Sequence, residues 1–327
     1  MSRPLMPAFL VAALVLAATP CGAQTYPLKP VRVLISSAPG GPVDIGLRGM
    51  TDALRQELGQ PVIIENQGAA DGIVAAQAFA RAAPDGYTLL HTSAGPISLN
   101  PVIYPKLPYD PQADFTPVAM TGQFNSVMIV NAAVPVSSFR ELLALAKAKP
   151  GTLSWGAAGT NGTSHMYAEW FRHTLNIDFY NVPYKNNVQT LAATASGEIH
   201  GTLFALGGAS GQAKAGKVKI LAAISEQRLA AMPNLPTVKE EGVDLVIRNW
   251  VGTFARAGTP RDIIERWNRS LSKIVADKTY AQKVLEPQGF EAAPPSGEPV
   301  EAFAQFLVRD KALYVRIKNE AKLKTGE

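Results

Sequence analysis

The chain has 327 residues, of which 47% are hydrophobic and 17% are charged, and its formal net charge is +5. This length suits two domains of ordinary size, and the composition excludes an intrinsically disordered chain. The sequence contains no run of five basic residues and no nucleic-acid-binding motif, so we expect no nucleic-acid partner. We interpret the positive charge as a mild aid to anionic ligands.

The first 23 residues have the pattern of a secretory signal peptide. Arg3 is the only charged residue among them, and an apolar run follows at 8–18. Cys21 and Ala23 are small residues placed three and one before a cleavage site after Ala23, and Pro20 argues against lipid attachment at Cys21. Because Cys21 is the only cysteine, cleavage removes every thiol and every possible disulfide. We therefore expect a mature protein that is exported to the periplasm.

After the signal peptide, short apolar strands alternate with amphipathic helices. In the first part, strands are expected at 31–36, 62–65 and 88–92, and helices at 43–58 and 74–83. This alternation is typical of a parallel sheet with helices on both faces. Residues 101–115 are rich in proline and tyrosine, and we expect them to be irregular.

A second alternation begins with a strand at 126–131. Ser138 and Glu141 then form a capping box at the start of a helix. Further strands are expected at 153–155, 179–183, 199–204, 218–224 and 250–254, and further helices at 163–175, 188–195, 261–276, 280–285 and 300–321. The pattern predicts an α/β fold with two lobes, one formed by 24–124 with 250–327 and the other by 125–249. Each lobe should be a largely parallel sheet, with the ligand beyond the carboxyl ends of its strands.

The segment 36–44 (SSAPGGPVD) joins the first strand to its helix. Gly40 and Gly41 allow a tight turn, and the amides at the start of a helix favour an anion. Asp44, in the first helical turn, could cap those amides itself. The residues alone leave both alternatives open, an anion-binding loop or an ordinary glycine-rich turn. The glycine spacing does not match a dinucleotide-binding fingerprint.

The segment 156–165 (GAAGTNGTSH) also joins a strand to a helix. Its hydroxyl, amide and backbone groups are neutral donors suited to a carboxylate or a phosphate. His165 would lie in the first helical turn, where it could contact a ligand or only pack against or cap the helix.

Other patterns point away from catalysis and metal binding. Residues 211–218 (GQAKAGKV) match part of a phosphate-binding loop, but Val218 replaces the Ser or Thr that would hold magnesium, and a strand follows. The histidines at 91, 165, 173 and 200 lack the spacing of metal ligands. No nucleophile-elbow motif is present. We identify no catalytic residue and no metal ligand, and we expect no cofactor and no enzymatic activity.

A series of short motifs in a fixed order links the chain to a known family. They are Tyr26-Pro27, Pro39-Gly40-Gly41 with Asp44, Leu58-Gly59-Gln60-Pro61, Pro84-Asp85-Gly86-Tyr87-Thr88-Leu89-Leu90, Leu107-Pro108-Tyr109-Asp110, Gly156, Gly159, His165, Val182-Pro183-Tyr184-Lys185, Trp250 and Gly258-Thr259-Pro260. On these motifs, which run from Tyr26 to about Tyr314, the chain resembles the Bug family of periplasmic receptors for tripartite tricarboxylate transporters.

The resemblance implies a Venus-flytrap periplasmic binding protein with its ligand between the lobes. It also implies that the first loop holds one ligand carboxylate and that the second loop completes the site. Carried over to this chain, the expected ligand-binding residues are Ser37, Ala38, Gly40, Gly41, Val43, Asp44, Ser93, Ala158, Gly159, Thr160, Thr163, His165 and Phe204. The chain departs from the family pattern at 36–38, Ala157, Asn186, His200 and Ala205, and these departures leave the identity of the ligand open.

The function expected from the resemblance is a monomeric receptor that captures a small carboxylate-bearing metabolite. It would deliver this ligand to the membrane permease subunits of a tripartite transporter. The alternative is an extracytoplasmic sensor subunit that uses the same cleft. The second loop offers no carboxylate, and Asp44 is expected to bind backbone amides, so we further expect an acid with no essential ammonium contact.

Overall fold

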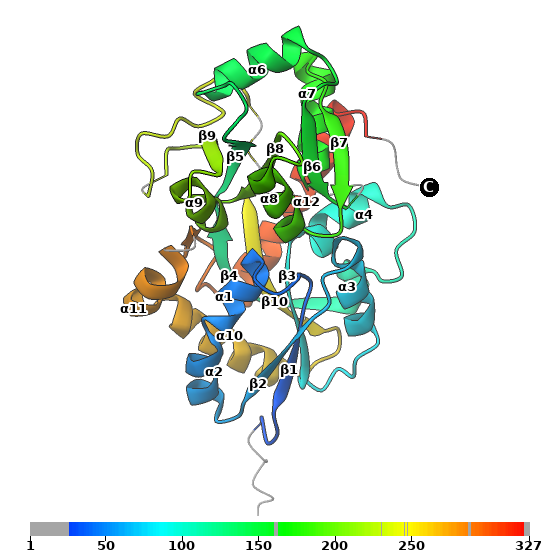
Figure 1. Cartoon of the computed structure of the whole chain (residues 1–327). Coiled ribbons are helices and arrows are strands. Elements are labelled where there is room, and N and C mark those ends of the chain that lie inside the picture. The colour runs from blue at the N-terminus through cyan, green and yellow to red at the C-terminus, as the bar shows by residue number, and fades with distance from the viewer. Residues whose placement is uncertain are drawn as a thin grey trace, which may run out of the picture.

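The computed structural model describes residues 26–159, 163–229, 231–244, 246, 248–286 and 289–323. It has two α/β lobes, one above the other in Figure 1, each built on one sheet flanked by helices. The predicted two-lobed α/β fold is therefore confirmed. The expected signal peptide, residues 1–23, lies outside the described residues.

The first lobe contains a six-stranded sheet in the order β11-β4-β10-β3-β1-β2. Its strands are β1 (Val31–Ile35), β2 (Val62–Asn66), β3 (Thr88–Ser93), β4 (Phe115–Phe124), β10 (Asn249–Arg256) and β11 (Phe290–Glu291). Its helical segments are α1 (Pro42–Arg48), α2 (Thr51–Leu58), η1 (Ala70–Gly72), α3 (Ile73–Ala80), η2 (Gly95–Leu99), α4 (Asn100–Ile103), α5 (Pro111–Asp114), α10 (Arg261–Val275), α11 (Lys278–Tyr280), η3 (Ala281–Leu285) and α12 (Val300–Glu320).

The second lobe contains a five-stranded sheet in the order β7-β6-β8-β5-β9. Its strands are β5 (Ser126–Asn131), β6 (Ser154–Ala158), β7 (Tyr180–Tyr184), β8 (Gly201–Ala205) and β9 (Val218–Ile224). Its helices are α6 (Phe139–Ala148), α7 (Thr163–Leu175), α8 (Asn187–Ser196) and α9 (Leu206–Lys214). Sheet membership changes between β4 and β5 and again before β10. The division of the chain into one lobe formed by 24–124 with 250–327 and another formed by 125–249 stays a prediction.

Both sheets are mixed, which corrects the expectation of largely parallel pairing. In the first lobe β1 pairs in parallel with β2 and β3, but β10 is antiparallel to β3 and β4. In the second lobe β6 pairs in parallel with β7 and β8, but β5 is antiparallel to β8 and β9. The reason is that β5 and β10 are the strands by which the chain enters each lobe from the other, so they run away from the junction while their neighbours run toward it.

Several predicted elements have different bounds in the structure. The helix expected at 43–58 is divided into α1 and α2 at Gly49, where an added Cβ would lie 2.1 Å from Val284 Cγ1. Strand β4 was not predicted, because Pro117 and Gly122 interrupt its sequence pattern. Residues 211–214, the first part of the segment 211–218 that matches part of a phosphate-binding loop, lie in α9, and this helix buries Leu206 and Ala209. The structure also places short helices in the segment 101–115 that was expected to be irregular.

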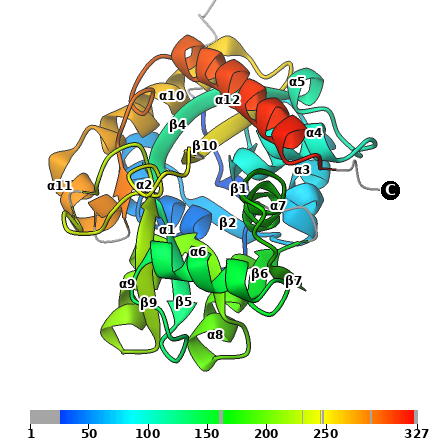
Figure 2. The ribbon, with the colours of Figure 1, turned by 90° about the horizontal axis from the view of Figure 1, so that it is seen from above.

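The C-terminal helix α12 connects the two lobes. Seen from above, it lies along β4 and reaches α7 of the second lobe (Figure 2). Trp170 of α7 donates a hydrogen bond to Glu320 Oε2 at 3.0 Å. One continuous cluster of buried side chains joins Trp250, Phe254 and Phe303 of the first lobe to Trp155 and Phe171 of the second. The apolar core therefore continues across the junction on this side of the molecule.

Candidate ligand-binding cavity between the lobes

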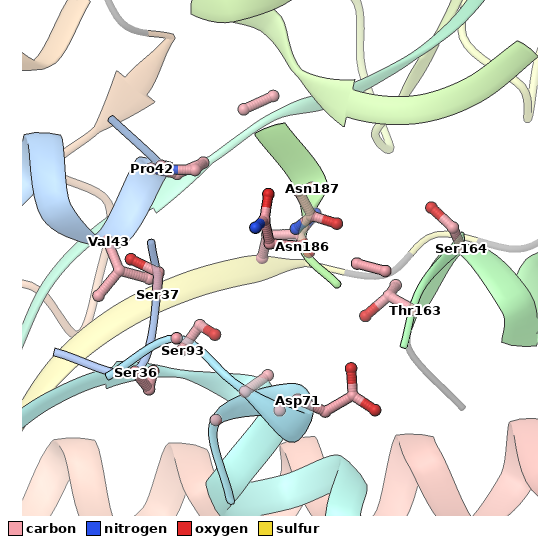
Figure 3. Close-up of a pocket in the computed structure, with 18 of the residues that line it drawn as sticks. Ser36, Ser37, Pro42, Val43, Asp71, Ser93, Thr163, Ser164, Asn186 and Asn187 are labelled. Carbon is pink, nitrogen blue, oxygen red and sulfur yellow. The ribbon is translucent and has the colours of Figure 1, made fainter. Parts of the chain in front are cut away.

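A cavity of about 170 Å³ lies between the two lobes (Figure 3). It is lined by residues at the carboxyl ends of β1, β2 and β3 in the first lobe and of β6, β7 and β8 in the second. Open α/β sheets bind their ligands at this end of the strands. A cavity of about 150 Å³ holds a benzene-sized molecule, so this one matches a small metabolite.

The loop after β1 forms one wall of the cavity. The hydroxyl of Ser36 lies 2.6 Å from that of Thr92, near the end of β3. Ser37 Oγ is shielded from solvent and has no hydrogen-bond partner within the described part of the chain. Buried hydroxyls are almost always paired in native proteins. Ser37 therefore retains hydrogen-bonding capacity that a ligand in the cavity could use.

Asp44 is satisfied by its own lobe. Its carboxylate accepts hydrogen bonds from Gly40 N at 2.9 Å, from Arg48 Nε at 2.9 Å and from Asn66 Nδ2 at 2.8 Å. Burial by itself would raise the pKa of Asp44, but these hydrogen bonds hold the pKa below its usual value. The side chain thus fixes the loop after β1 to α1 and to the end of β2.

The loop after β2 packs directly against the loop after β1. A Cβ added to Gly68 would lie 2.3 Å from Ala38 N and 2.4 Å from the carbonyl carbon of Ser37. Only glycine allows this backbone-to-backbone contact. It brings the following residues, including Asp71, to the cavity wall.

Asp71 has an unusual backbone conformation and a half-buried side chain. Its φ of 53° and ψ of 32° are in the left-handed region, which residues other than glycine rarely adopt. Its Oδ2 accepts a hydrogen bond from the Tyr104 hydroxyl at 3.0 Å, and its backbone carbonyl accepts one from Asn100 Nδ2 at 3.1 Å. Burial raises the pKa of Asp71, and the bond from Tyr104 offsets part of that rise.

The second lobe lines the cavity with the first turns of two helices. Thr163 and Ser164 begin α7, and Asn187 begins α8 (Figure 3). Asn186 caps α8 by accepting a hydrogen bond from Gln189 N at 3.0 Å. Lys185, which precedes this cap, also lines the cavity. Helix N-termini carry partial positive charge, so the second lobe presents a wall that favours an anion.

The segments that cross between the lobes complete the lining. Asn249 Nδ2 donates a hydrogen bond to Ser126 Oγ at 2.9 Å and so joins the two crossings. Trp250 lines the cavity, and its Nε1 donates to Asp310 Oδ2 of α12 at 2.8 Å. Burial raises the pKa of Asp310 to about 6. The position of Trp250 is therefore set by a buried carboxylate on the C-terminal helix.

The structure brings many of the predicted site residues to this cavity. Those that line it are Ser37, Ala38, Gly41, Val43, Ser93, Ala158, Thr163 and Phe204. Thr160 lies outside the described residues. The binding roles of these residues are predictions.

Four predicted residues do not line the cavity. Gly40 and Asp44 are bonded to each other in the loop after β1. Gly159 lies against the Asp71 carboxylate, since an added Cβ would be 2.0 Å from Asp71 Oδ1. His165 is half-buried on another side of α7 from Ser164, and burial lowers its pKa.

The prediction missed several lining residues that lie in strand-to-helix loops. Asp71, Lys185, Asn186 and Asn187 all follow the carboxyl ends of parallel strands. The topological rule that ligands bind beyond those ends applies to every such loop, and it could have selected them from the sequence. Ser126 and Trp250 had no such signal, because they lie in the crossings.

Within the described ranges, no cluster of histidine, cysteine, aspartate and glutamate side chains is arranged to hold a metal ion. In the same part of the chain, no helix is long and apolar enough to span a membrane. The polar groups that line the cavity are hydroxyl, amide, carboxylate and ammonium groups, which can hold a small polar ligand by hydrogen bonds and charge.

These features define a two-lobed solute-binding protein, and comparison with known proteins identifies the family. The family model described as tripartite tricarboxylate transporter family receptor matches residues 47–318. The chain belongs to this family of periplasmic solute-binding proteins, and its resemblance to the Bug family is confirmed. It is 32% identical over 277 residues to a UPF0065 protein of Cupriavidus necator, covering 84% of each chain. It is 28% identical over 267 residues to protein BugT of Bordetella pertussis, covering 81% of this chain and 82% of BugT.

Two solved structures of similar proteins contain small dicarboxylic acids. Rpa4515 of R. palustris with adipate has a TM-score of 0.87 and 26% identity, covering 91% of this chain and 99% of that one. MatC of Rhodopseudomonas palustris with bound malate has a TM-score of 0.82 and 28% identity, covering 89% of this chain and 99% of that one.

Proposed function

We propose that this protein is a periplasmic receptor that binds a small carboxylate-bearing metabolite in the interlobe cavity. The observation that carries the proposal is the convergence of the first turns of α7 and α8 and of Lys185 on a cavity of about 170 Å³. Such a wall favours a carboxylate, and the similar proteins solved with adipate and malate bind ligands of that class.

In this proposal the ligand is released unchanged to the membrane permease subunits of a tripartite transporter. The receptor acts as a monomer, it needs no cofactor, and closure of the lobes around the ligand is the signal that the permease recognises. Residues 1–23 are removed after Ala23 during export, so the mature chain begins at Gln24. The measured mass of the periplasmic protein tests this cleavage site.

A thermal-shift screen of the mature protein against a panel of carboxylic acids tests the binding function. A ligand present at about 100 times its dissociation constant stabilises a protein by about 2.7 kcal/mol, which is a clear shift. We expect one class of acid to raise the melting temperature. If no acid of the panel does so, the proposal is wrong.

A matched pair of lysine variants tests the location of the site. Lys185→Met removes a charge at the cavity and keeps a long side chain, and we expect it to weaken binding of the selected acid about tenfold, or ~1.4 kcal/mol. Lys147→Met removes an exposed charge from α6, outside the cavity lining, and should leave binding unchanged. Equal effects of the two variants would contradict a site at the cavity.

A further inference from the structure

Asp71 is a carboxylate in a cavity whose other features favour an anion. It lines the cavity from the loop after β2, and its side chain extends into the space below Thr163 in Figure 3. The bound acid would bring a second negative charge to the same cavity. A lone carboxylate facing an anionic ligand in a closed site is unfavourable unless a positive group lies between them.

Asp71 has no cationic partner in the described part of the chain. Its carboxylate is bonded to the neutral Tyr104 hydroxyl, and no arginine or lysine forms an ion pair with it there. Asp44, in the neighbouring loop, is paired with Arg48. A carboxylate that is partly removed from water loses hydration, and pairing with a cation compensates for that loss. A positive group supplied by the ligand would provide this pairing at Asp71.

The surroundings of Asp71 hold its carboxylate in one place. The left-handed backbone at Ala70 (φ 50°) and Asp71 (φ 53°) is unfavourable for both residues, at about 1–2 kcal/mol each. Asn100 binds the backbone carbonyl, and Tyr104 binds the carboxylate. Strained backbone that is fixed by the surrounding structure is characteristic of functional sites.

We propose that Asp71 binds an ammonium group of the ligand, so that the ligand is a small amino acid and not an acid without an amine. Its carboxylate would face the helix starts and Lys185, and its ammonium would face Asp71. This inference rests on the proposed binding function. It replaces the expectation of a ligand without an ammonium contact, which considered Asp44 and the second loop but omitted Asp71.

Pairs of acids that differ in one amine test the inference by titration calorimetry of the mature protein. Suitable pairs are succinate and aspartate, glutarate and glutamate, and butyrate and 4-aminobutyrate. In at least one pair we expect the amine-bearing member to bind at least tenfold more tightly. In Asp71→Asn, which keeps the side-chain shape and tolerates the left-handed backbone, the two members should bind within about twofold of each other. Asp52→Asn, an exposed position of α2, should keep the wild-type preference.

The outcomes separate this inference from the proposed function. If amine-free acids bind as tightly as their amine-bearing partners, the inference is wrong and the receptor function stands. The inference is also wrong if Asp71→Asn weakens both members of a pair equally, because that result assigns Asp71 to lobe closure. If neither these pairs nor any acid of the carboxylate panel binds, both the function and the inference fail.

Discussion

Two neighbouring loops of the first lobe each place an aspartate near the interlobe cavity, and the two carboxylates have opposite environments. Asp44 is 2% exposed and accepts hydrogen bonds from Gly40, Arg48 and Asn66. Asp71 has a left-handed backbone, one neutral hydrogen-bond donor and no cation within the described residues. The pKa of Asp44 lies below its usual value, and that of Asp71 lies above it.

The difference separates a structural carboxylate from a candidate ligand-binding one. Asp44 stands in a recognisable glycine-rich motif, yet its hydrogen bonds are used within the first lobe. Asp71 belongs to no motif that we identified, yet it lies at the cavity wall and its carboxylate has no cationic partner among the described residues. A carboxylate without a cationic partner among the described residues is therefore a better indication of ligand binding here than membership of a motif.

The largest expected effect is the loss of stability in Asp44→Ala. This change leaves Gly40 N–H, Arg48 and Asn66 without their acceptor, and we expect the free energy of unfolding to fall by about 3 kcal/mol. Urea denaturation of the ligand-free protein measures it. The control Asp52→Ala alters an exposed residue of α2 and should change stability by no more than about 0.5 kcal/mol. If Asp44→Ala is as mild as its control, Asp44 is not structural.

A third carboxylate, Asp310, tests whether a raised pKa alone marks a ligand site. It is buried in the core, where burial raises its pKa to about 6, and it does not line the cavity. The folded protein binds this proton more tightly than the unfolded chain does. Ionisation of Asp310 therefore costs stability as the pH rises from about 4 to about 6, by about 3 kcal/mol in all.

Asp310→Asn removes that ionisation. Because the raised pKa of Asp310 already includes its hydrogen bond from Trp250, we expect the variant to be about 3 kcal/mol more stable than wild type at pH 8. This advantage should disappear below about pH 4, and ligand affinity should not change. Urea denaturation across pH 3.5–8 measures the difference, with the exposed Asp262→Asn as control. A difference that does not vary with pH would contradict the assigned cause.

Gly159→Ala should disturb the contact between the Asp71 loop and the second lobe. The added Cβ would lie 2.0 Å from Asp71 Oδ1, so Asp71 would have to move. We expect about tenfold weaker ligand binding, or ~1.4 kcal/mol, by calorimetry. Gly197→Ala is a matched control, because its φ of +83° imposes similar backbone strain while its nearest contact is 3.4 Å away at Asn131.

The double variant Gly159→Ala with Asp71→Gly tests whether the contact between the added Cβ and the Asp71 carboxylate causes the weaker binding. Removing the Asp71 side chain should restore lobe closure, so affinity for amine-free acids should return to within about threefold of that of Asp71→Gly alone. Continued weak binding in the double variant would show that strain at residue 159, and not the contact with Asp71, causes the defect.

The smallest expected effect is that of Asp71→Gly on stability. Relief of the left-handed backbone, about 1 kcal/mol, is offset by the greater freedom of glycine in the unfolded chain, about 0.4–1 kcal/mol. The free energy of unfolding should therefore change by no more than about 0.5 kcal/mol, in contrast to Asp44→Ala. A loss near 3 kcal/mol in urea denaturation would place Asp71 in the same structural class as Asp44.

Local patterns were sufficient to predict much of the fold. The apolar runs of β1, β3 and β9 and the amphipathic helices α10 and α12 agree closely with the structure. Strand β4 could not be predicted, because its pairing with β10 joins residues more than a hundred positions apart and its own sequence contains Pro117 and Gly122. The antiparallel direction of β5 and β10 depends on where the chain crosses, which local periodicity does not encode.

The site was predictable only in part, for a similar reason. Ser37 and Thr163 lie in loops with strong glycine and hydroxyl patterns, and both line the cavity. Asp44 does not line the cavity, and its carboxylate binds Arg48 and Asn66, which lie 4 and 22 positions away in the sequence. No local sequence pattern connects Asn66 to Asp44. The position of Asp71 depends on Gly68 packing against Ala38 and on Tyr104 from a later segment, and these contacts exist only after folding.

A crystal structure of the mature protein with the tightest-binding acid of the panel tests the central claim most directly. We predict that the ligand lies between the lobes, with its carboxylate within hydrogen-bonding distance of Ser37 or of the first turns of α7 and α8. Both lobes should contact it. A ligand bound outside this cavity, or held by one lobe alone in a closed structure, would contradict the account.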